Sequence, residues 1–377
     1  MSKNPVWLAI GGLLAMAAGI GIGRFVYTPI LPPMVEALHL TKSEAGLIAS
    51  ANFVGYFAGA LLAAVHLPGS RRTWLIGALA VNALALAAMG AVSTLALFLL
   101  LRFAAGLSSA LTLIFASALV LDRLAIAGRG RLSAVHFAGV GLGIAVSAVV
   151  VAPFADWRAM WLASGVLALV PVAAVPLLVP PDHPGSQITT SRTRQPLPPG
   201  FAPLAVAYGL FGFGYVITAT FIVALVRGSP ESAALEPYVW VVVGLSAAPS
   251  VALWTGLGAR LGIRRTFAIT AFVEAAGVAI SVLWITAATV MVAAVLLGGT
   301  FMGLTSLGLI AAREIGGNGG GDPRRRIALM TAVFSAGQIL GPVFAGYLYD
   351  RTGSLVAPSV AAAAGLVVAG LLTVRQD

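Results

Sequence analysis

Apolar runs of about 20 residues recur along the whole chain, with only short segments between them. A helix of that length crosses the ~30 Å hydrocarbon core of a bilayer. Only 9% of the 377 residues are charged, and the mean hydropathy is +1.00. Because soluble proteins carry roughly 25% charged residues, the pattern predicts an all-α protein whose main solvent is lipid.

Runs bounded by charge, Pro and Gly predict twelve membrane spans, at 6–36, 43–66, 73–93, 95–121, 132–152, 158–178, 201–226, 237–258, 266–285, 288–312, 327–348 and 355–374. Segment 179–200 is rich in Pro, Ser and Thr and reads as a flexible connector. We therefore expect an N-terminal six-helix bundle over 1–178, a connector over 179–200 and a C-terminal six-helix bundle over 201–377.

The net charge of +10 is concentrated on one side of the predicted spans. Of the 22 Lys and Arg residues, sixteen fall on one side, four on the other and two inside helices. By the positive-inside rule, both termini and the connector should face the cytoplasm of an inner, or plasma, membrane. This distribution explains the basic character without a nucleic-acid partner, since the basic residues form no separate soluble domain. The absence of Cys excludes disulfides and thiolate metal sites, and we expect no cofactor.

The two halves of the chain contain similar short segments. Residues Gly21–Thr28 parallel Gly212–Ala219 at an offset of 191, which sets Arg24 against Tyr215. Two other matches, P-G-S-R-R with L-G-I-R-R and G-L-S-S with G-L-T-S, have offsets of 193 and 197. Duplicated six-helix units place a substrate site at their interface, near the middle of the bilayer.

Several motifs resemble those of the major facilitator superfamily. The run Arg102–Ala110 is similar to R-x-x-x-G-x-x-x-A, and Gly337–Gly346 is similar to G-x-x-x-G-P-x-x-x-G. Within the superfamily, Gly21–Met34 and Gly212–Phe221 resemble the YbfB/YjiJ family. The resemblance implies twelve transmembrane helices in two pseudo-symmetric six-helix bundles, transport by alternating access, and a role for Arg102 in proton coupling.

One motif departs from the superfamily pattern. In the loop after the second span, His66 occupies the place where the superfamily has Asp. We expect Asp122, at the end of the fourth span, to serve as a substitute partner for Arg71 or Arg72.

Three charged residues fall inside predicted spans: Arg24, Arg102 and Glu274. A charge at the bilayer centre costs at least about 2.5–3.5 kcal/mol, so each is a functional candidate. The guanidinium of Arg24 suits a carboxylate or phosphate, and helical spacing places Tyr27 and Thr28 on its face. We predict that these residues bind an anionic solute; the alternative is that Arg24 pairs with helix carbonyls and only braces the bundle.

Candidates for coupling and gating are Arg102, Asp122, His136 and Glu274. Arg102 lies near a helix end, so it could instead extend to the interface. If protons are transported, Glu274, Asp122 or His136 must carry them. Packing roles for Glu274 and His136 remain alternatives.

Other polar residues at plausible cavity positions are Asn52, Tyr56, Tyr215, Thr218 and Gln338. Asn52 and Tyr56 share a helix face, as do Tyr215 and Thr218. We predict that this set completes the substrate site. The alternative is that they hold helices together, since such polar contacts contribute about 0.6 kcal/mol each.

No enzyme signature is present, because the G-x-G spacings lie inside membrane spans with no strand before them. We predict a secondary transporter, acting as a monomer, that moves a small anionic organic solute and is driven by protons. The alternative within transport is a proton-driven exporter of amphipathic compounds. An alternative of another class is a non-transporting membrane sensor or scaffold.

Overall fold

The structure is a computed structural model that describes residues 4–65, 67–181, 197–315 and 323–374. Twelve helices in these ranges are long and apolar enough to cross a membrane, which confirms the twelve predicted spans. His66 and most of the predicted connector (182–196) lie outside the described residues.

The N-terminal bundle is built from the first six spans. Its first span is discontinuous and runs as α1 (Pro5–Met16), the π-helix η1 (Ala17–Ile22), α2 (Gly23–Phe25) and α3 (Tyr27–Leu38). The remaining spans are α4 (Lys42–Ala64), α5 (Arg71–Met89), α6 (Leu95–Ile126), α7 (Ser133–Val151, preceded by the 3₁₀ turn η2, Gly130–Leu132) and α8 (Trp157–Leu178).

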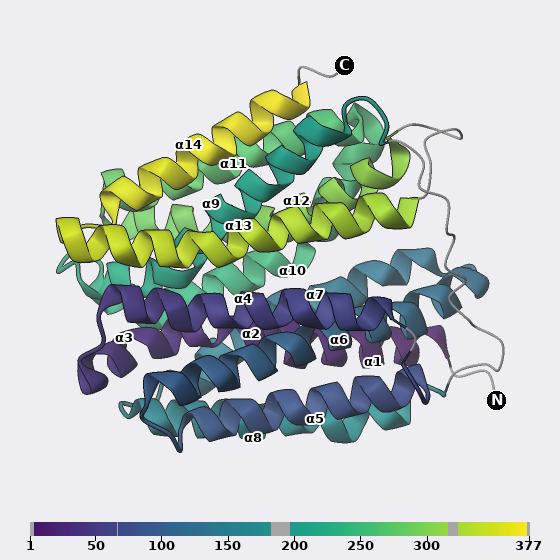
Figure 1. Cartoon of the computed structure of the whole chain (residues 1–377), viewed down its shortest axis with the longest axis horizontal. Coiled ribbons are helices and arrows are strands. Elements are labelled where there is room, and N and C mark those ends of the chain that lie inside the picture. Colours follow the sequence, from purple (N-terminus) through teal and green to yellow (C-terminus); the bar gives the residue numbers. More distant parts are fainter. Residues whose placement is uncertain (1–3, 66, 182–196, 316–322, 375–377) are drawn as a thin grey trace.

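The C-terminal bundle repeats this arrangement with the last six spans. Its helices are α9 (Phe201–Arg227), α10 (Glu236–Leu261, preceded by the 3₁₀ turn η3, Ala233–Leu235), α11 (Ile263–Leu283), α12 (Ala287–Glu314), α13 (Pro323–Thr352) and α14 (Val356–Val374). The purple-to-blue bundle lies below the green-to-yellow one in Figure 1, with α5 and α8 farthest from α14. The two six-helix bundles confirm the architecture predicted from the sequence.

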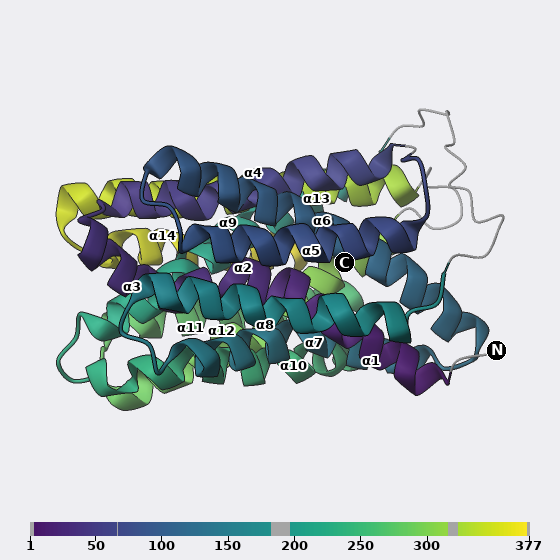
Figure 2. The ribbon, with the colours of Figure 1, turned by 90° about the horizontal axis from the view of Figure 1, so that it is seen from below.

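The first and seventh spans lie at the centre of the molecule. The most apolar window of each is 72% buried, against 33% for the sixth span, so α8 faces lipid while α1–α3 and α9 face protein. Two helix pairs form the seams between the bundles: α4 packs against α13, and α7 packs against α10. The pairing of α4 with α13 is also visible from below (Figure 2).

Glycines allow the backbones to meet at both seams. A Cβ on Gly46 would lie 2.2 Å from the carbonyl oxygen of Pro342, and one on Gly346 would lie 2.2 Å from that of Lys42. A Cβ on Gly244 would lie 2.4 Å from a backbone nitrogen of α7. The helices run between two ends of the molecule. We call the end where α1 begins and α14 finishes the terminal end, and we call the other end the opposite end. The glycine contacts just described fall in the half of the molecule nearer the opposite end.

Candidate functional site

A cavity of about 460 Å³ lies between the two bundles. Arg24, Phe25 and Tyr56 of the N-terminal bundle line it on one side, and Tyr215 and Phe301 of the C-terminal bundle line the other. The cavity extends to the terminal ends of α7 and α12, where its lining includes Ser133 and Arg313. Among the described lining residues, the charged ones are Arg24 and Arg313, and both are cationic.

Arg24 sits in the wall of this cavity among aromatic rings. Its guanidinium carbon lies 4.4 Å from the ring centroid of Tyr56, 4.8 Å from that of Phe53 and 5.6 Å from that of Phe25. The residue is 8% exposed, and its buried Nε and Nη2 have no hydrogen-bond partner among the described residues. Aromatic faces stabilise the cation but leave these donors unused, so the site retains capacity for an anion.

Side chains from α5 and α6 donate to carbonyls of the discontinuous first span. Arg102 donates through Nη1 to the Gly23 carbonyl (3.2 Å) and through Nη2 to the Arg24 carbonyl (3.1 Å). Asn82 donates to Ala18 (3.0 Å), and Ser109 donates to Gly19. A polar side chain that satisfies backbone carbonyls stabilises irregular backbone at membrane depth. These donors therefore hold the segment that carries Arg24.

A donor from the other bundle satisfies another carbonyl of this span. Pro29 has no N–H with which to bond the carbonyl of Phe25, four residues earlier. The indole Nε1 of Trp240, on α10, donates to that carbonyl at 3.0 Å. The Phe25 carbonyl left without a helical donor by Pro29 thus makes a contact between the bundles directly beside Arg24.

Parallel aromatic rings form the wall of the cavity in the C-terminal bundle. Tyr215 stacks on Phe301 (centroids 5.7 Å apart, 5° between planes) and on Phe334 (6.0 Å, 3°). Gln338 donates through Nε2 to the hydroxyl of Tyr215. Gln338 is fully buried, so it positions the Tyr215 hydroxyl and does not line the cavity itself.

Glu274, on α11, is fully buried behind this wall. Neither of its carboxyl oxygens has a hydrogen-bond partner among the described residues. Thr300 of α12 lies beside the carboxyl but donates its hydroxyl hydrogen to the Leu296 carbonyl. Charged residues of the helices packed around α11, such as Arg227, Glu236, Arg260 and Arg313, lie at helix ends. An isolated carboxylate in such surroundings is costly, so the neutral acid is the form that fits the site.

The eight residues predicted to bind substrate separate into two groups. Arg24, Tyr56 and Tyr215 line the cavity. The other five are not among its lining residues: Tyr27, Thr28, Asn52, Thr218 and Gln338. Tyr27 and Thr28, three and four residues after Arg24, contact other helices and do not line the cavity.

These other residues make contacts within the protein. Tyr27 donates to the Ala45 carbonyl (2.9 Å), and Asn52 donates to the Arg102 carbonyl (3.1 Å). Thr28 donates across the bundles to the Ala219 carbonyl (2.7 Å). The hydroxyl of Thr218 is buried without a partner among the described residues.

The predicted coupling residues lie in different surroundings. Arg102 is 2% exposed and does not extend to the interface. His136 is buried in α7, with Nε2 placed 3.2 Å from the Ser117 hydroxyl. Asp122 is exposed at the terminal end of α6, and its role as a partner of Arg71 or Arg72 stays a prediction.

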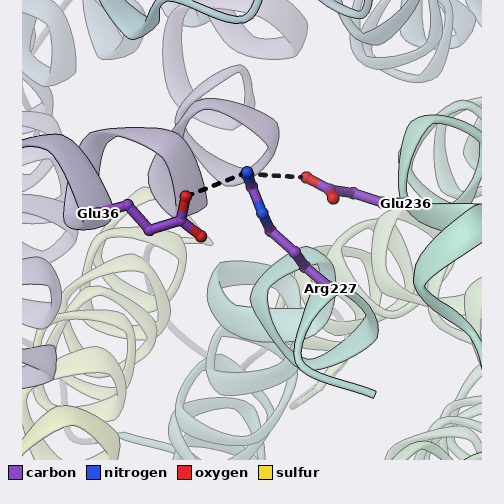
Figure 3. Close-up of polar contacts among 3 residues, drawn as sticks. All are labelled: Glu36, Arg227 and Glu236. Carbon is purple, nitrogen blue, oxygen red and sulfur yellow. Dashed lines mark hydrogen bonds and ion pairs between the residues drawn. The ribbon is translucent and has the colours of Figure 1, made fainter. Parts of the chain in front are cut away.

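Polar contacts close the opposite end between the bundles. Asp350, on α13, accepts hydrogen bonds from the backbone N–H groups of Lys42 (3.0 Å) and Ser43 (2.8 Å) at the start of α4. Arg227, at the end of α9, lies between two carboxylates, 3.2 Å from Glu36 and 3.3 Å from Glu236 (Figure 3). With these contacts formed, the cavity reaches the terminal end while the opposite end is shut.

Sequence reasoning found Tyr56 but missed Phe25 and Phe53 around Arg24, and it missed the charged cluster at the opposite end. Nothing in sequence distinguishes Phe53 or Phe301 from the other phenylalanines of the spans. For Glu36 and Arg227 a signal existed, because they are 191 residues apart, which is the offset of the repeat. Among the described residues, no group of three or more His, Asp or Glu side chains could hold a metal ion.

Two pseudo-symmetric six-helix bundles around a central cavity define a secondary transporter of the major facilitator type, a multi-pass membrane protein and not an enzyme. The family model described as "Uncharacterised MFS-type transporter YbfB" matches residues 16–374. The chain belongs to this YbfB family, which confirms the family resemblance drawn from its motifs.

Solved structures of the same fold include two of the nucleoside transporter NupG. A point mutant of NupG superposes with a TM-score of 0.75 at 15% identity, covering 98% of this chain and 99% of that one. The NupG structure without that mutation gives 0.73, also at 15% identity, covering 98% of each chain. A bacterial homologue of the human lysosomal transporter Spinster, in an inward-facing and unoccupied conformation, gives 0.69 at 15% identity, covering 100% of this chain and 96% of that one. A comparison with curated protein sequences finds no match.

Proposed function

We propose that this transporter carries a small organic anion, bound by Arg24. The observation that carries the proposal is the guanidinium in the cavity wall with two buried donor nitrogens unused. A permanent cation at membrane depth is costly, and the described ion pairs do not include Arg24. A carboxylate entering the cavity would meet both the charge and the unused donors.

The apolar wall supports an amphipathic anion rather than a strongly hydrated one. The wall formed by the C-terminal bundle presents the parallel rings of Tyr215, Phe301 and Phe334. Such a wall favours an apolar body attached to the anionic group. The same lining supports a second candidate function, export of amphipathic compounds without a required charge.

We propose proton coupling through Glu274. Of the three predicted proton carriers, Asp122 is exposed at a helix end and His136 has Ser117 beside its Nε2. Glu274 combines full burial with two carboxyl oxygens that accept no hydrogen bond from the described residues. A carboxyl that is neutral here and ionises when water reaches it could bind and release a proton during each cycle.

The proposed orientation puts the terminal end in the cytoplasm of an inner membrane, following the distribution of basic residues. In that orientation the cavity faces inward and the closed end faces the periplasm. Alternating access would then require separating the α4–α13 and α7–α10 seams. We propose that the monomer is the transporting unit.

The test is a thermal-stability screen of purified protein against aromatic and aliphatic carboxylates and their neutral amides. We expect carboxylates to stabilise the wild-type protein and amides not to. Arg24→Gln should abolish the stabilisation, while Arg351→Gln, which changes an exposed arginine at the opposite end, should leave it intact. Equal stabilisation by amides and carboxylates would favour the amphipathic exporter.

A further inference from the structure

A second hollow lies between the bundles at the opposite end. Its volume is about 230 Å³, and its wall includes Pro29 and Pro33 of α3, Val223 and Arg227 of α9, and Glu236 of α10. Among the described lining residues, Arg227 and Glu236 are charged and the others are apolar. Each of the two hollows thus has an arginine in its wall, and Arg227, unlike Arg24, also has an acidic neighbour, Glu236.

The two carboxylates on Arg227 belong to different bundles. Glu236 comes from α10, in the same bundle as Arg227, and its side chain is 25% exposed. Glu36 comes from α3 in the other bundle, and its side chain is 63% exposed. When the bundles separate at this end, Arg227 therefore keeps Glu236 and loses Glu36.

We propose that Arg227 and the hollow beside it form an outer binding site for the carboxylate of the transported anion, which takes the place of Glu36 when the opposite end opens. The proposal rests on the proposed function. In the closed state, a carboxylate oxygen of Glu36 lies 3.2 Å from Nη2 of Arg227. The solute would bring the same chemical group, a carboxylate, to that nitrogen. Pairs this exposed are weak, so a free carboxylate can compete with Glu36.

The outer site would act before Arg24 for a solute arriving from the opposite end. Pro29 lines the hollow five residues after Arg24, so the hollow and the central cavity lie along the same discontinuous span. A solute at Arg227 would thus be held until the central cavity becomes accessible. The pair Arg227–Glu36 would serve both as a closing contact and as the place where the anion first binds.

The experiment measures opening of this end with spin labels. The chain has no Cys, so Ala37→Cys on α3 and Ala234→Cys on η3, both exposed and in different bundles, give a unique label pair. Double electron–electron resonance in nanodiscs reports the distance between them as benzoate is added, with benzamide as the neutral control. We expect benzoate, and not benzamide, to increase the population with the longer distance.

Variants assign this response to the outer site. Glu36→Gln should lower the half-maximal benzoate concentration about 3- to 5-fold, because the competing carboxylate is gone. Arg227→Gln should abolish the benzoate response, while Glu231→Gln, which changes an exposed acid at the same end, should behave as wild type. The proposal is overturned if Arg227→Gln still responds to benzoate. It is also overturned if Glu36→Gln and Glu231→Gln have the same half-maximal benzoate concentration.

The same measurement in an Arg24→Gln background separates the two sites. We expect benzoate still to open this end, since Arg227 is intact. Loss of the response in that background would overturn the outer site while leaving Arg24 as the anion site. The converse outcome has two parts: the spin-label response depends on Arg227, and Arg24→Gln does not change the thermal stabilisation by carboxylates. That outcome would overturn the function proposed for Arg24 and would leave the outer site supported.

Discussion

Thr28 donates a hydrogen bond of 2.7 Å to the carbonyl of Ala219, the residue that occupies its own position in the second repeat. Glu36 and Arg227, which form an ion pair at 3.2 Å, are also 191 residues apart. Equivalent residues of two halves can meet only near the axis that relates the halves. The first and seventh spans therefore lie side by side next to the pseudo-symmetry axis. Both contacts join the two bundles, so both must break when the bundles separate at the opposite end.

Thr28→Val should favour opening of the opposite end. The substitution keeps the shape of the side chain but removes the donor to Ala219, a loss of about 0.6 kcal/mol, or roughly a threefold shift in population. The spin-label pair Ala37→Cys/Ala234→Cys measures it. Thr331→Val is the matched control, because Thr331 donates within its own helix. Equal distance distributions in the two variants would show that the contact has no role in closure.

Gly46→Ala should prevent the α4–α13 seam from closing. The added Cβ would lie 2.2 Å from the Pro342 carbonyl oxygen, which leaves no room for the present approach of the two helices. We expect loss of transport and a spin-label distance that remains long, with the protein still folded. Gly77→Ala is the control, since nothing lies within 4 Å of its new Cβ and Ala stabilises a helix by about 0.5–1 kcal/mol relative to Gly. Normal transport by Gly46→Ala would contradict this view of the seam.

Arg102→Gln should destabilise the protein and weaken anion binding together. The glutamine cannot satisfy both the Gly23 and Arg24 carbonyls, and one unsatisfied buried carbonyl costs about 1–3 kcal/mol. Arg102→Lys should be intermediate, because it keeps the charge but not the planar fork. Thermal unfolding and carboxylate titration measure the two effects. Weakened binding with unchanged stability would instead indicate direct contact between Arg102 and the solute.

Glu274→Gln should separate binding from proton-driven accumulation. The amide resembles the neutral acid in shape but cannot release a proton. In proteoliposomes, the carboxylate that stabilises the protein best should still exchange. With one proton per solute, the wild-type protein can raise the ratio of inside to outside concentration roughly tenfold per unit of pH gradient. In Glu274→Gln this concentration ratio should fall to about one. His136→Gln tests the competing carrier, and retained accumulation in Glu274→Gln would reject the proposal for that residue.

The number and length of the spans follow from sequence because a bilayer demands about 20 consecutive apolar residues from each helix. The repeat offset of 191 likewise aligns Arg24 with Tyr215 in the two halves of the sequence, and both residues line the cavity. Helical spacing did not reveal that the hydroxyls of Tyr27 and Thr28 bond carbonyls of α4 and α9, because those acceptors lie on other spans.

Local sequence thus determined the membrane spans, the duplication and the presence of a buried cation. Tertiary structure alone decided what surrounds that cation, because the rings of Phe53 and Tyr56, on a different span, reach it only when α4 packs beside the first span. It also decided that Arg102 supports the backbone of Arg24 and that Arg227 joins the two bundles. Such contacts depend on helix packing across tens to hundreds of residues, which hydrophobic periodicity does not encode.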